Sequence, residues 1–344
     1  MTVKEFRELL RDKRTLAMIV VMPLMLLVVF GYAANFSVTS VKTAVVGPQT
    51  TQAVSGLPDF FEVVLTDPES GDAQARAMLR DNDVEVAIVS GNGAPVAYVD
   101  GSNLFAAQST VSVLNKRDGQ IRIDVLYNPQ LLTAWVMIPA IVGLILLFIG
   151  TIITSIGLVR EREAGTLEQL AVMPISSAQV ILGKIVPYFV LACADMAIVT
   201  GLGMLIFDVP FNGSPMTFVL GAGLFLFVVL GVGVFISTIS RTTGQAIQTA
   251  FFFLIPQILL SGMIFPLDAM AAGVRWIGYL LPLTYFTMIS QGVMLRGAGV
   301  ASLWLPLVVL AAMAAVVFFG AVLRFRRDLA PSYRDGHRNR RVSS

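Results

Sequence analysis

Six long runs of apolar residues, with few charges inside them, constrain the fold of this chain more than any other feature of its sequence. A helix needs about 20 consecutive apolar residues to cross the roughly 30 Å hydrocarbon core of a bilayer. Each run is long enough, so the pattern predicts a polytopic α-helical membrane protein with six transmembrane helices. The runs are 16–34, 132–158, 180–207, 218–239, 246–265 and 303–323.

The composition agrees with a chain that folds in a solvent other than water, because 56% of its residues are hydrophobic and only 13% are charged. The net charge of +2 is too small to indicate nucleic-acid binding. The chain has one cysteine, Cys193, and one histidine, His337. An intramolecular disulfide is therefore impossible, and we expect neither a metal site nor a thiol-based active site.

Residues 1–15 predict an amphipathic helix that lies in the membrane interface. Apolar residues such as Val3, Phe6 and Leu9 recur at near-helical spacing, with charged residues between them. The alternative is a solvated helix cap before the first span. Residues 16–35 predict transmembrane helix 1, whose apolar run exceeds the core of a signal peptide, so we expect it to be retained.

Residues 36–130 differ in composition, because charges, Gly, Pro, Asn and Asp return there. Period-two alternation and short apolar runs predict strands, and longer periodic stretches predict helices. The segment is long enough to support a modest core, so we expect a small extracytoplasmic α/β domain between transmembrane helices 1 and 2. The expected strands are 43–46, 62–65, 84–89, 95–99 and 121–127, and the expected helices are 69–80 and 104–115.

The block 131–323 is predicted to hold transmembrane helices 2–6. Within it, residues 266–301 are only half polar, but Pro266, Asp268, Arg275 and Pro282 leave no uninterrupted apolar run. We therefore expect a re-entrant or interfacial helical pair at 266–301, with a seventh short span as the alternative. Residues 324–344 form a basic tail.

Lysine and arginine near the ends of the spans predict the orientation, because these residues favour the cytoplasmic side. If six helices alternate, the basic residues of 1–14, 160–184 and the 324–344 tail, together with Arg241, all fall on one side. The loop 208–215, on the other side, has no lysine or arginine. We expect a multi-pass protein of the inner (plasma) membrane with both termini in the cytoplasm and 36–130 outside. The basic tail can also attract anionic lipid.

Sequence motifs for catalysis are missing from the chain. It has no G-x-x-x-x-G-K-[ST] phosphate loop, and no G-x-S-x-G, H-E-x-x-H or paired-carboxylate arrangement stands out. We therefore expect a protein that is not an enzyme. If the chain transports a molecule, the energy comes from a partner or from an ion gradient.

The loop between the second and third spans is the most informative segment. Charged residues lead, Gly165 and Thr166 follow, and a short helix-forming stretch ends at Pro174. Thr166 can cap this helix with Gln169 three residues on. A short amphipathic element between two long spans can transmit a push from a cytoplasmic motor.

The loop sequence Glu-Arg-Glu-Ala-Gly-Thr-Leu-Glu-Gln-Leu from Glu161, followed by Pro174, resembles the signature loop of the type-2 ABC exporter permeases. The resemblance covers essentially the whole chain, and the large domain between spans 1 and 2 is similar to the multidrug-type branch. The other matching stretches are 4–14, Pro23-Leu24, Phe30-Gly31-Tyr32, Tyr127-Asn128-Pro129, Gly183-Lys184, Pro187-Tyr188, Leu260-Ser261-Gly262, Phe265-Pro266, Leu281-Pro282 and Arg296-Gly297.

The resemblance implies a mechanism with partners. Two permease subunits pair, as a homodimer or a heterodimer, and two cytoplasmic ATP-binding subunits dock beneath them. ATP and Mg²⁺ would be bound by the ATPase, and no cofactor by this chain. Residues 161–174 would form a coupling helix, and the second and fifth spans would line the path of an amphiphilic, drug-like or lipid-like cargo. The implied ATPase-contact residues are Glu161, Glu163, Gly165, Thr166, Leu167, Glu168 and Pro174.

Three polar residues inside spans are candidates for lining the path. A carboxylate at the bilayer centre, such as Asp195, costs roughly 2.5–3.5 kcal/mol on insertion scales, so it must face protein or water or be protonated. Asp195 is either a substrate or proton contact or a buried interhelical hydrogen bond, and we favour the latter. Gln248 and Gln257 either line the path or have a structural role. Gly143, Gly150 and Gly157 repeat every seven residues and predict close helix packing.

Two other functions compete with the exporter. A gradient-driven secondary transporter would be expected to have ionisable residues near the midplane of the membrane and an internal repeat. The sequence offers one midplane acid, Asp195, and no convincing repeat. A membrane-anchored binding protein that acts through residues 36–130 would need only one or two spans, so six spans argue against it.

Overall fold

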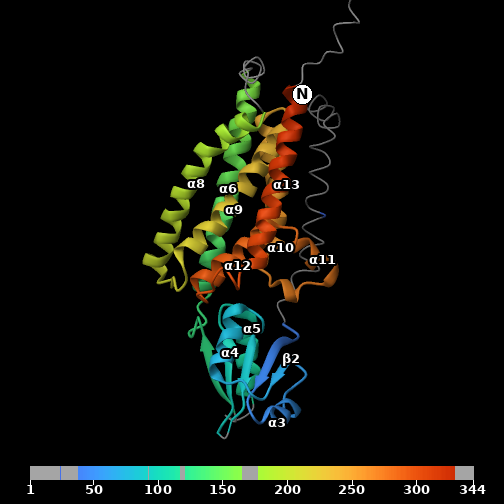
Figure 1. Ribbon diagram of the computed structural model, residues 1–344. Helices are drawn as coiled ribbons and strands as arrows, with labels where there is room; N and C mark the ends of the chain where they lie inside the picture. Colours follow the sequence, from blue (N-terminus) through green and yellow to red (C-terminus); the bar gives the residue numbers. More distant parts are fainter. Residues whose placement is uncertain (1–23, 25–37, 92, 117–120, 165–176, 330–344) are drawn as a thin grey trace, which may run out of the picture.

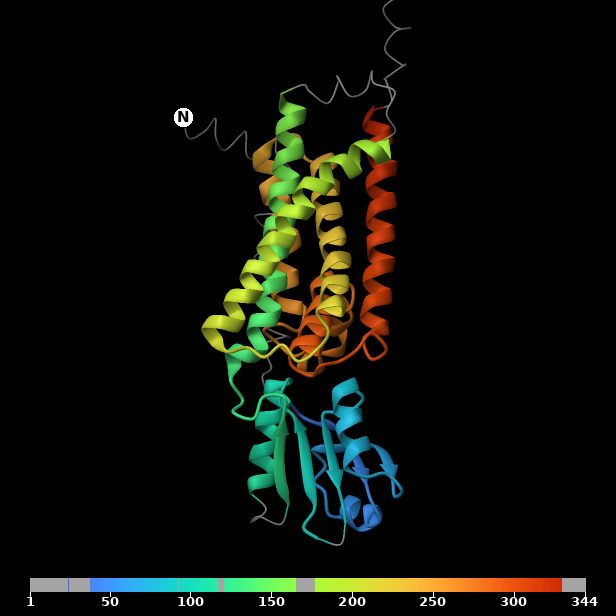
Figure 2. The same ribbon diagram turned by 60° about the vertical axis from the view of Figure 1, so that its left-hand side comes forward.

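The computed structural model of the protein describes residues 24, 38–91, 93–116, 121–164 and 177–329. The chain forms two parts that lie end to end, a bundle of long helices and an α/β domain (Figures 1 and 2). The interfacial helix predicted for residues 1–15, the first span and the basic tail lie outside the described residues, apart from the end of helix α13 and Leu24.

The α/β domain is built on one five-stranded sheet with the order β2-β1-β3-β4-β5. β1 pairs in parallel with β2 and β3, β3 and β4 are antiparallel, and β4 and β5 are parallel. The β1–β2 register shifts between Thr43 and Ala44. The strands are β1 (Val41–Val46), β2 (Phe61–Asp67), β3 (Val86–Val89), β4 (Val96–Asp100) and β5 (Arg122–Leu126).

Helices cover both faces of this sheet, as Figure 1 shows. The helices α3 (Thr50–Ser55) and α5 (Leu104–Asn115) pack on one face, and α4 (Asp72–Asp81) packs on the other with Met78 and Leu79. The Asn103 side chain caps α5 by accepting a hydrogen bond from the backbone N–H of Ala106 at 3.4 Å. The short helix α3 was not predicted, because six residues carry too little periodicity.

Within the described residues, five helices are long and apolar enough to cross a membrane. Their positions correspond to the second to sixth predicted spans. The helix α9 lies in the middle of the bundle and contacts α6, α8 and α13, which explains why its side chains are the most buried. The helices are α6 (Thr133–Glu163), α8 (Ser177–Phe207), α9 (Pro215–Ile239), α10 (Thr243–Leu260) and α13 (Trp304–Leu329).

The heptad glycines of α6 confirm the packing prediction. A Cβ atom at Gly143 would collide with the ring of Phe286, and one at Gly150 would lie 2.7 Å from a methyl carbon of Val229. At Gly157 it would collide with the hydroxyl of Tyr188. These glycines therefore let three neighbouring helices approach the backbone of α6 closely.

Between α10 and α13 lie three short elements, η1 (Leu267–Ala269), α11 (Ala272–Gly278) and α12 (Pro282–Met294). The longest has 13 residues and is about 20 Å long at 1.5 Å per residue, which is too short to span a bilayer. α12 is buried against α6, α9 and α13, whereas α11 exposes Trp276 and is followed by exposed Tyr279. This arrangement is a pair of helices at the domain end of the bundle.

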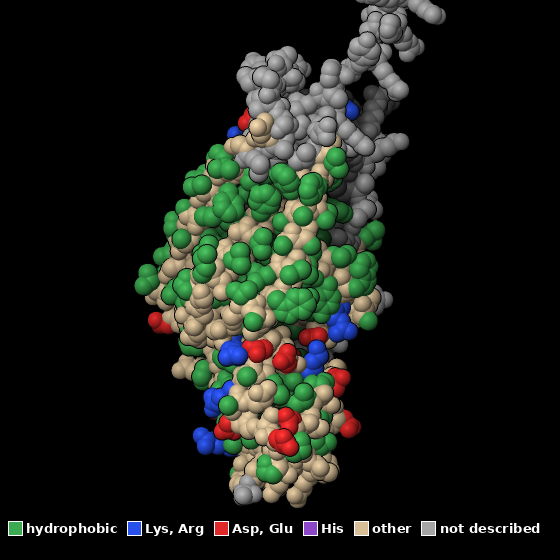
Figure 3. Space-filling model, viewed as in Figure 1, with side chains coloured by type: hydrophobic (Ala, Val, Ile, Leu, Met, Phe, Trp, Pro, Cys, Tyr) green, Lys and Arg blue, Asp and Glu red, His purple; other side chains and the backbone are tan. Residues whose placement is uncertain are grey.

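On the face of the bundle seen in Figure 3, apolar side chains predominate, and charged side chains gather below them, where the α/β domain begins. Leu191 and Leu205 on α8 and Phe319 on α13 are more than half exposed. Exposed apolar area on this scale needs lipid or another protein to cover it. The molecule is therefore a polytopic helical membrane protein.

Candidate functional site

The helix α6 ends at Glu163, at the end of the bundle far from the α/β domain (Figure 1). The Glu163 carboxylate accepts two hydrogen bonds there, from the backbone N–H and the hydroxyl of Thr243, both at 3.1 Å. Thr242 caps α10 by accepting from the N–H of Gln245. An anionic side chain at the N-terminus of a helix is favoured by the partial positive charge of the helix end. Glu163 thus connects the end of α6 to the start of α10.

Of the predicted coupling segment 161–174, the structure describes only residues 161–164. Glu161 is half-buried and Glu163 is exposed at the end of α6. The other predicted ATPase-contact residues lie outside the described residues: Gly165, Thr166, Leu167, Glu168 and Pro174.

Asp195 lies midway along α8, as the sequence predicted, and is half-buried. Its Oδ2 atom is buried and has no hydrogen-bond partner among the described residues. α8 packs on α6, α9 and α13.

Gln257 is fully buried on α10, where its Oε1 accepts a hydrogen bond from the backbone N–H of Leu283 at 3.2 Å. This contact ties α10 to the first turn of α12. Gln248, nearer the other end of α10, is exposed. The structure therefore does not bring the three predicted polar residues together: α8, with Asp195, and α10 lie on different sides of the bundle (Figure 1).

The joint between the helical bundle and the α/β domain contains polar contacts that sequence reasoning missed. Arg296, just after α12, donates a hydrogen bond from Nη1 to the Ser102 hydroxyl at 3.0 Å and lies 3.8 Å from Asp100. The Ser302 hydroxyl donates to Asp81 at 2.6 Å. A single arginine between α12 and α13 was the available sequence signal, but its partners lie almost two hundred residues away.

The carboxyl groups at this joint have shifted pKa values. Burial raises the pKa of Glu85 to about 7, against hydrogen bonding to the Lys42 backbone N–H, and repulsion from Asp268 adds to the rise. Burial also raises the pKa of Asp100, against the attraction of Arg296. Burial opposes the ionisation of Asp81, but hydrogen bonds from Arg80 and Ser302 outweigh it and lower the pKa.

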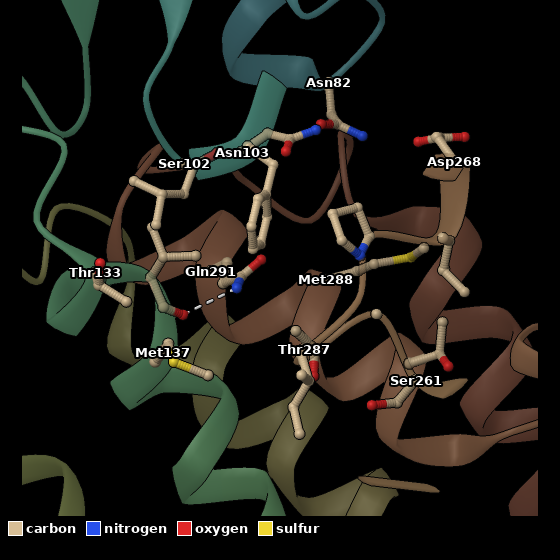
Figure 4. A pocket seen from close by; sticks show the side chains of 18 of the residues that line it. Asn82, Ser102, Asn103, Thr133, Met137, Ser261, Asp268, Thr287, Met288 and Gln291 are labelled. Carbon is tan, nitrogen blue, oxygen red and sulfur yellow. Dashed lines mark hydrogen bonds between the residues drawn. The ribbon is translucent and has the colours of Figure 1, made fainter. Parts of the chain in front are cut away.

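A cavity of about 190 Å³ lies at the same joint. The α/β domain contributes Asn82 and Asn103, α6 contributes Met137, and α12 contributes Met288 and Gln291 (Figure 4). Gln291 is held by a hydrogen bond from Nε2 to the backbone carbonyl of Val136 at 3.0 Å, the dashed line in Figure 4. The domain and the bundle thus both contribute polar and apolar side chains around one space.

Within the described part of the chain, no cluster of three or more His, Cys, Asp or Glu side chains is arranged to hold a metal ion. The observed geometry consists of helix-to-helix and helix-to-domain contacts rather than a constellation of reacting groups.

The fold and these contacts define the class, a polytopic helical membrane protein with an α/β domain at one end of the bundle and the contact of Glu163 with Thr243 at the other. The profile of the ABC-2 family transporter proteins matches residues 13–323. The chain therefore belongs to this family, as its sequence resemblance implied. It is a permease subunit and is not itself catalytic.

Three curated proteins of Escherichia coli K12 illustrate the similarity. The probable multidrug ABC transporter permease YbhR is 27% identical over 95% of this chain and 97% of its own length. The probable multidrug ABC transporter permease YbhS is 29% identical, over 86% of this chain and 87% of its own. The inner membrane transport permease YhhJ is 33% identical, over 59% and 54%.

Proposed function

We propose that this chain is the membrane-spanning subunit of an ATP-driven exporter that moves amphiphilic, drug-like or lipid-like cargo outward. The observation that carries the proposal is the family match over residues 13–323, which includes the loop after α6. The names of the relatives YbhR and YbhS, which describe multidrug transport, support a drug-like cargo. ATP and Mg²⁺ would be bound by the partner ATPase.

The assembly in this proposal contains two permease subunits and two cytoplasmic ATP-binding subunits. The second permease is either another copy of this chain or a related chain. Basic residues near the span ends support an inner-membrane orientation with both termini in the cytoplasm. The α/β domain then lies outside, and the loop 161–174 faces the ATPase as the coupling helix.

The contact between Glu163 and Thr243 gives this coupling a physical route. A displacement of the loop after α6 acts on the end of α6 directly and on the start of α10 through two hydrogen bonds of 3.1 Å. α6 and α10 are the second and fifth spans, which the family resemblance assigns to the export path. A single displacement of this segment would therefore move α6 and α10, the two path-lining helices, together.

A pull-down in mild detergent, scored for a bound ATPase, tests the proposal. The wild type is compared with a Gly165→Pro, Glu168→Arg double variant and with Glu62→Arg, a matched charge reversal on exposed β2 of the α/β domain. We expect the wild type and Glu62→Arg to retain the ATPase and the double variant to lose it while still inserting into the membrane. Equal retention by all three would refute the coupling assignment, and absence of any ATPase would refute the exporter assignment.

A gradient-driven carrier is the second candidate, because the Asp195 carboxylate has a buried oxygen without a partner among the described residues. Such a carrier would need no ATPase. Transport that persists without ATP and collapses when the proton gradient is dissipated, and that fails in Asp195→Asn, would favour it.

A further inference from the structure

The cavity between the α/β domain and the bundle has the build of a ligand site. It collects side chains from several separate segments, the first turns of α6, the loop 261–268, α12 and the domain. Its volume of about 190 Å³ is below the ~300–1,000 Å³ of pockets that enclose drug-sized ligands. A head group and the beginning of a chain fit that space better than a whole drug.

The apolar lining of the cavity is adaptable. Met137 and Met288 both line it, and Phe105 and Ile264 add an aromatic and a branched surface. Methionine is unbranched and polarisable, so it fits apolar ligands of different shape. This apolar lining therefore accommodates hydrocarbon chains of different shape.

The charges around the cavity favour a cationic guest. Arg296 lines the cavity with its charge offset by Asp100 at 3.8 Å; its Nη1 is bound to Ser102, and its buried Nε has no hydrogen-bond partner among the described residues. Asp268 lines the cavity with a side chain that is 56% exposed, and its partner Arg275, at 3.5 Å, is itself exposed. Exposed pairs of this kind contribute little, so the Asp268 carboxylate is open to a second cation.

A second carboxylate lies directly behind the wall of the cavity. The Glu85 Oε1 atom accepts a hydrogen bond of 2.6 Å from the side chain of Asn103, which lines the cavity. Glu85 and Asp268 repel each other electrostatically. A cation placed between them would relieve that repulsion.

We propose that this cavity binds the cationic head and the first part of the apolar chain of an amphiphile, with Asp268 as the charged contact. This inference rests on the proposed function only in identifying the ligand as exported cargo at the extracytoplasmic end of the bundle. Binding itself requires no ATPase, so the two claims fail separately.

The linked ionisation of Glu85 gives this site a recognisable signature. Its charge is influenced by Lys42 on β1, Asp100 on β4 and Asp268 in η1, and its hydrogen-bond partner Asn103 precedes α5. Because burial raises the Glu85 pKa to about 7, the carboxyl loses its proton near neutral pH. A cationic ligand therefore binds more tightly as the pH rises from about 6 to about 8, whereas a neutral ligand does not.

Protection of a cysteine in the cavity tests the proposal. Met288→Cys is introduced into a Cys193→Ser background, and the purified full chain in lipid nanodiscs is labelled with a maleimide. The probes are octyltrimethylammonium and octanesulfonate, which share a chain length and differ in the sign of their charge. Thr51→Cys, on exposed α3 at the far end of the domain, serves as the labelling control (Figure 1).

We expect octyltrimethylammonium to slow labelling at Met288→Cys but not at Thr51→Cys, and octanesulfonate to have no effect. Asp268→Asn should raise the half-maximal concentration of the cation about fivefold or more. Glu85→Gln should remove the gain in affinity between about pH 6 and about pH 8. Equal protection by both probes, or none by either, would overturn the proposal.

Discussion

Arg296 and Asp100 form an ion pair that joins the helical bundle to the α/β domain, with Nη1 and Oδ2 3.8 Å apart. The side chains are 8% and 1% exposed, so both charges lie away from water. A second contact, from Ser302 to Asp81, reinforces the joint. The domain therefore makes direct contacts with the segment between α12 and α13, in addition to its covalent connection to α6.

Asp100→Asn should destabilise the protein by about 3 kcal/mol, because it leaves the Arg296 charge buried without its partner. The midpoint of thermal unfolding in detergent measures this effect. Asp124→Asn is the matched control, since it removes the exposed ion pair of Asp124 with Arg76 and should cost less than about 1 kcal/mol. Equal losses in the two variants would show that burial of the Arg296 pair is unimportant.

Glu85 should make stability depend on pH. Its pKa in the folded protein, about 7, lies above the ordinary value of 4.5, so folding favours the protonated form. The stabilisation is fully present below about pH 4.5 and is lost as the pH rises through about 7. The unfolding midpoint of the wild type should therefore fall relative to that of Glu85→Gln as the pH rises from about 4.5 through about 7. Glu62→Gln, exposed on β2, serves as control, and a difference that stays flat with pH would contradict the assignment.

Gly143→Ala should destabilise the bundle by about 1–3 kcal/mol, because the added methyl group meets the ring of Phe286 and one of the helices must move. Gly201→Ala on α8 is the matched control, since nothing lies within 4 Å of its added Cβ. Unfolding midpoints of both variants in the same detergent provide the comparison. A harmless Gly143→Ala would mean that α6 and α12 are not in close contact.

Gln257→Leu should cost about 1–3 kcal/mol, because it leaves the buried N–H of Leu283 without an acceptor. Gln248→Leu, which changes an exposed side chain of the same helix, should affect stability less. Unfolding midpoints and cargo transport are measured on the same preparations. If Gln257→Leu altered transport at full stability, Gln257 would be a path contact and not a structural one.

Much of the fold follows from periodicity along the chain. The long apolar runs predict α6, α8, α9, α10 and α13, because a bilayer demands uninterrupted apolar length. The sequence 84–89 predicts β3 in the same way, from a short apolar run. The short helix α3 escaped prediction, since its six residues pack on the sheet through tertiary contacts rather than through a local signal.

The contacts at the joint could not be predicted. Arg296 and Asp100 are far apart in the sequence, and each residue alone is an ordinary charge beside an apolar stretch. Gln257 was predicted as a candidate for the path, but its carbonyl is committed to the N–H of Leu283, a contact that depends on how α12 folds back. Pairings of this kind become visible only when the helices are placed in space.

ATP-dependent uptake into inside-out membrane vesicles tests whether this chain is the membrane-spanning subunit of an ATP-driven exporter. The vesicles contain this chain and its partner ATPase, and the probe is a fluorescent amphiphilic cation. We expect accumulation that requires ATP and both proteins, that stops when the phosphate-loop lysine of the ATPase is replaced, and that survives dissipation of ion gradients. Accumulation that needs an ion gradient and proceeds without ATP would contradict this assignment and would identify a gradient-driven carrier.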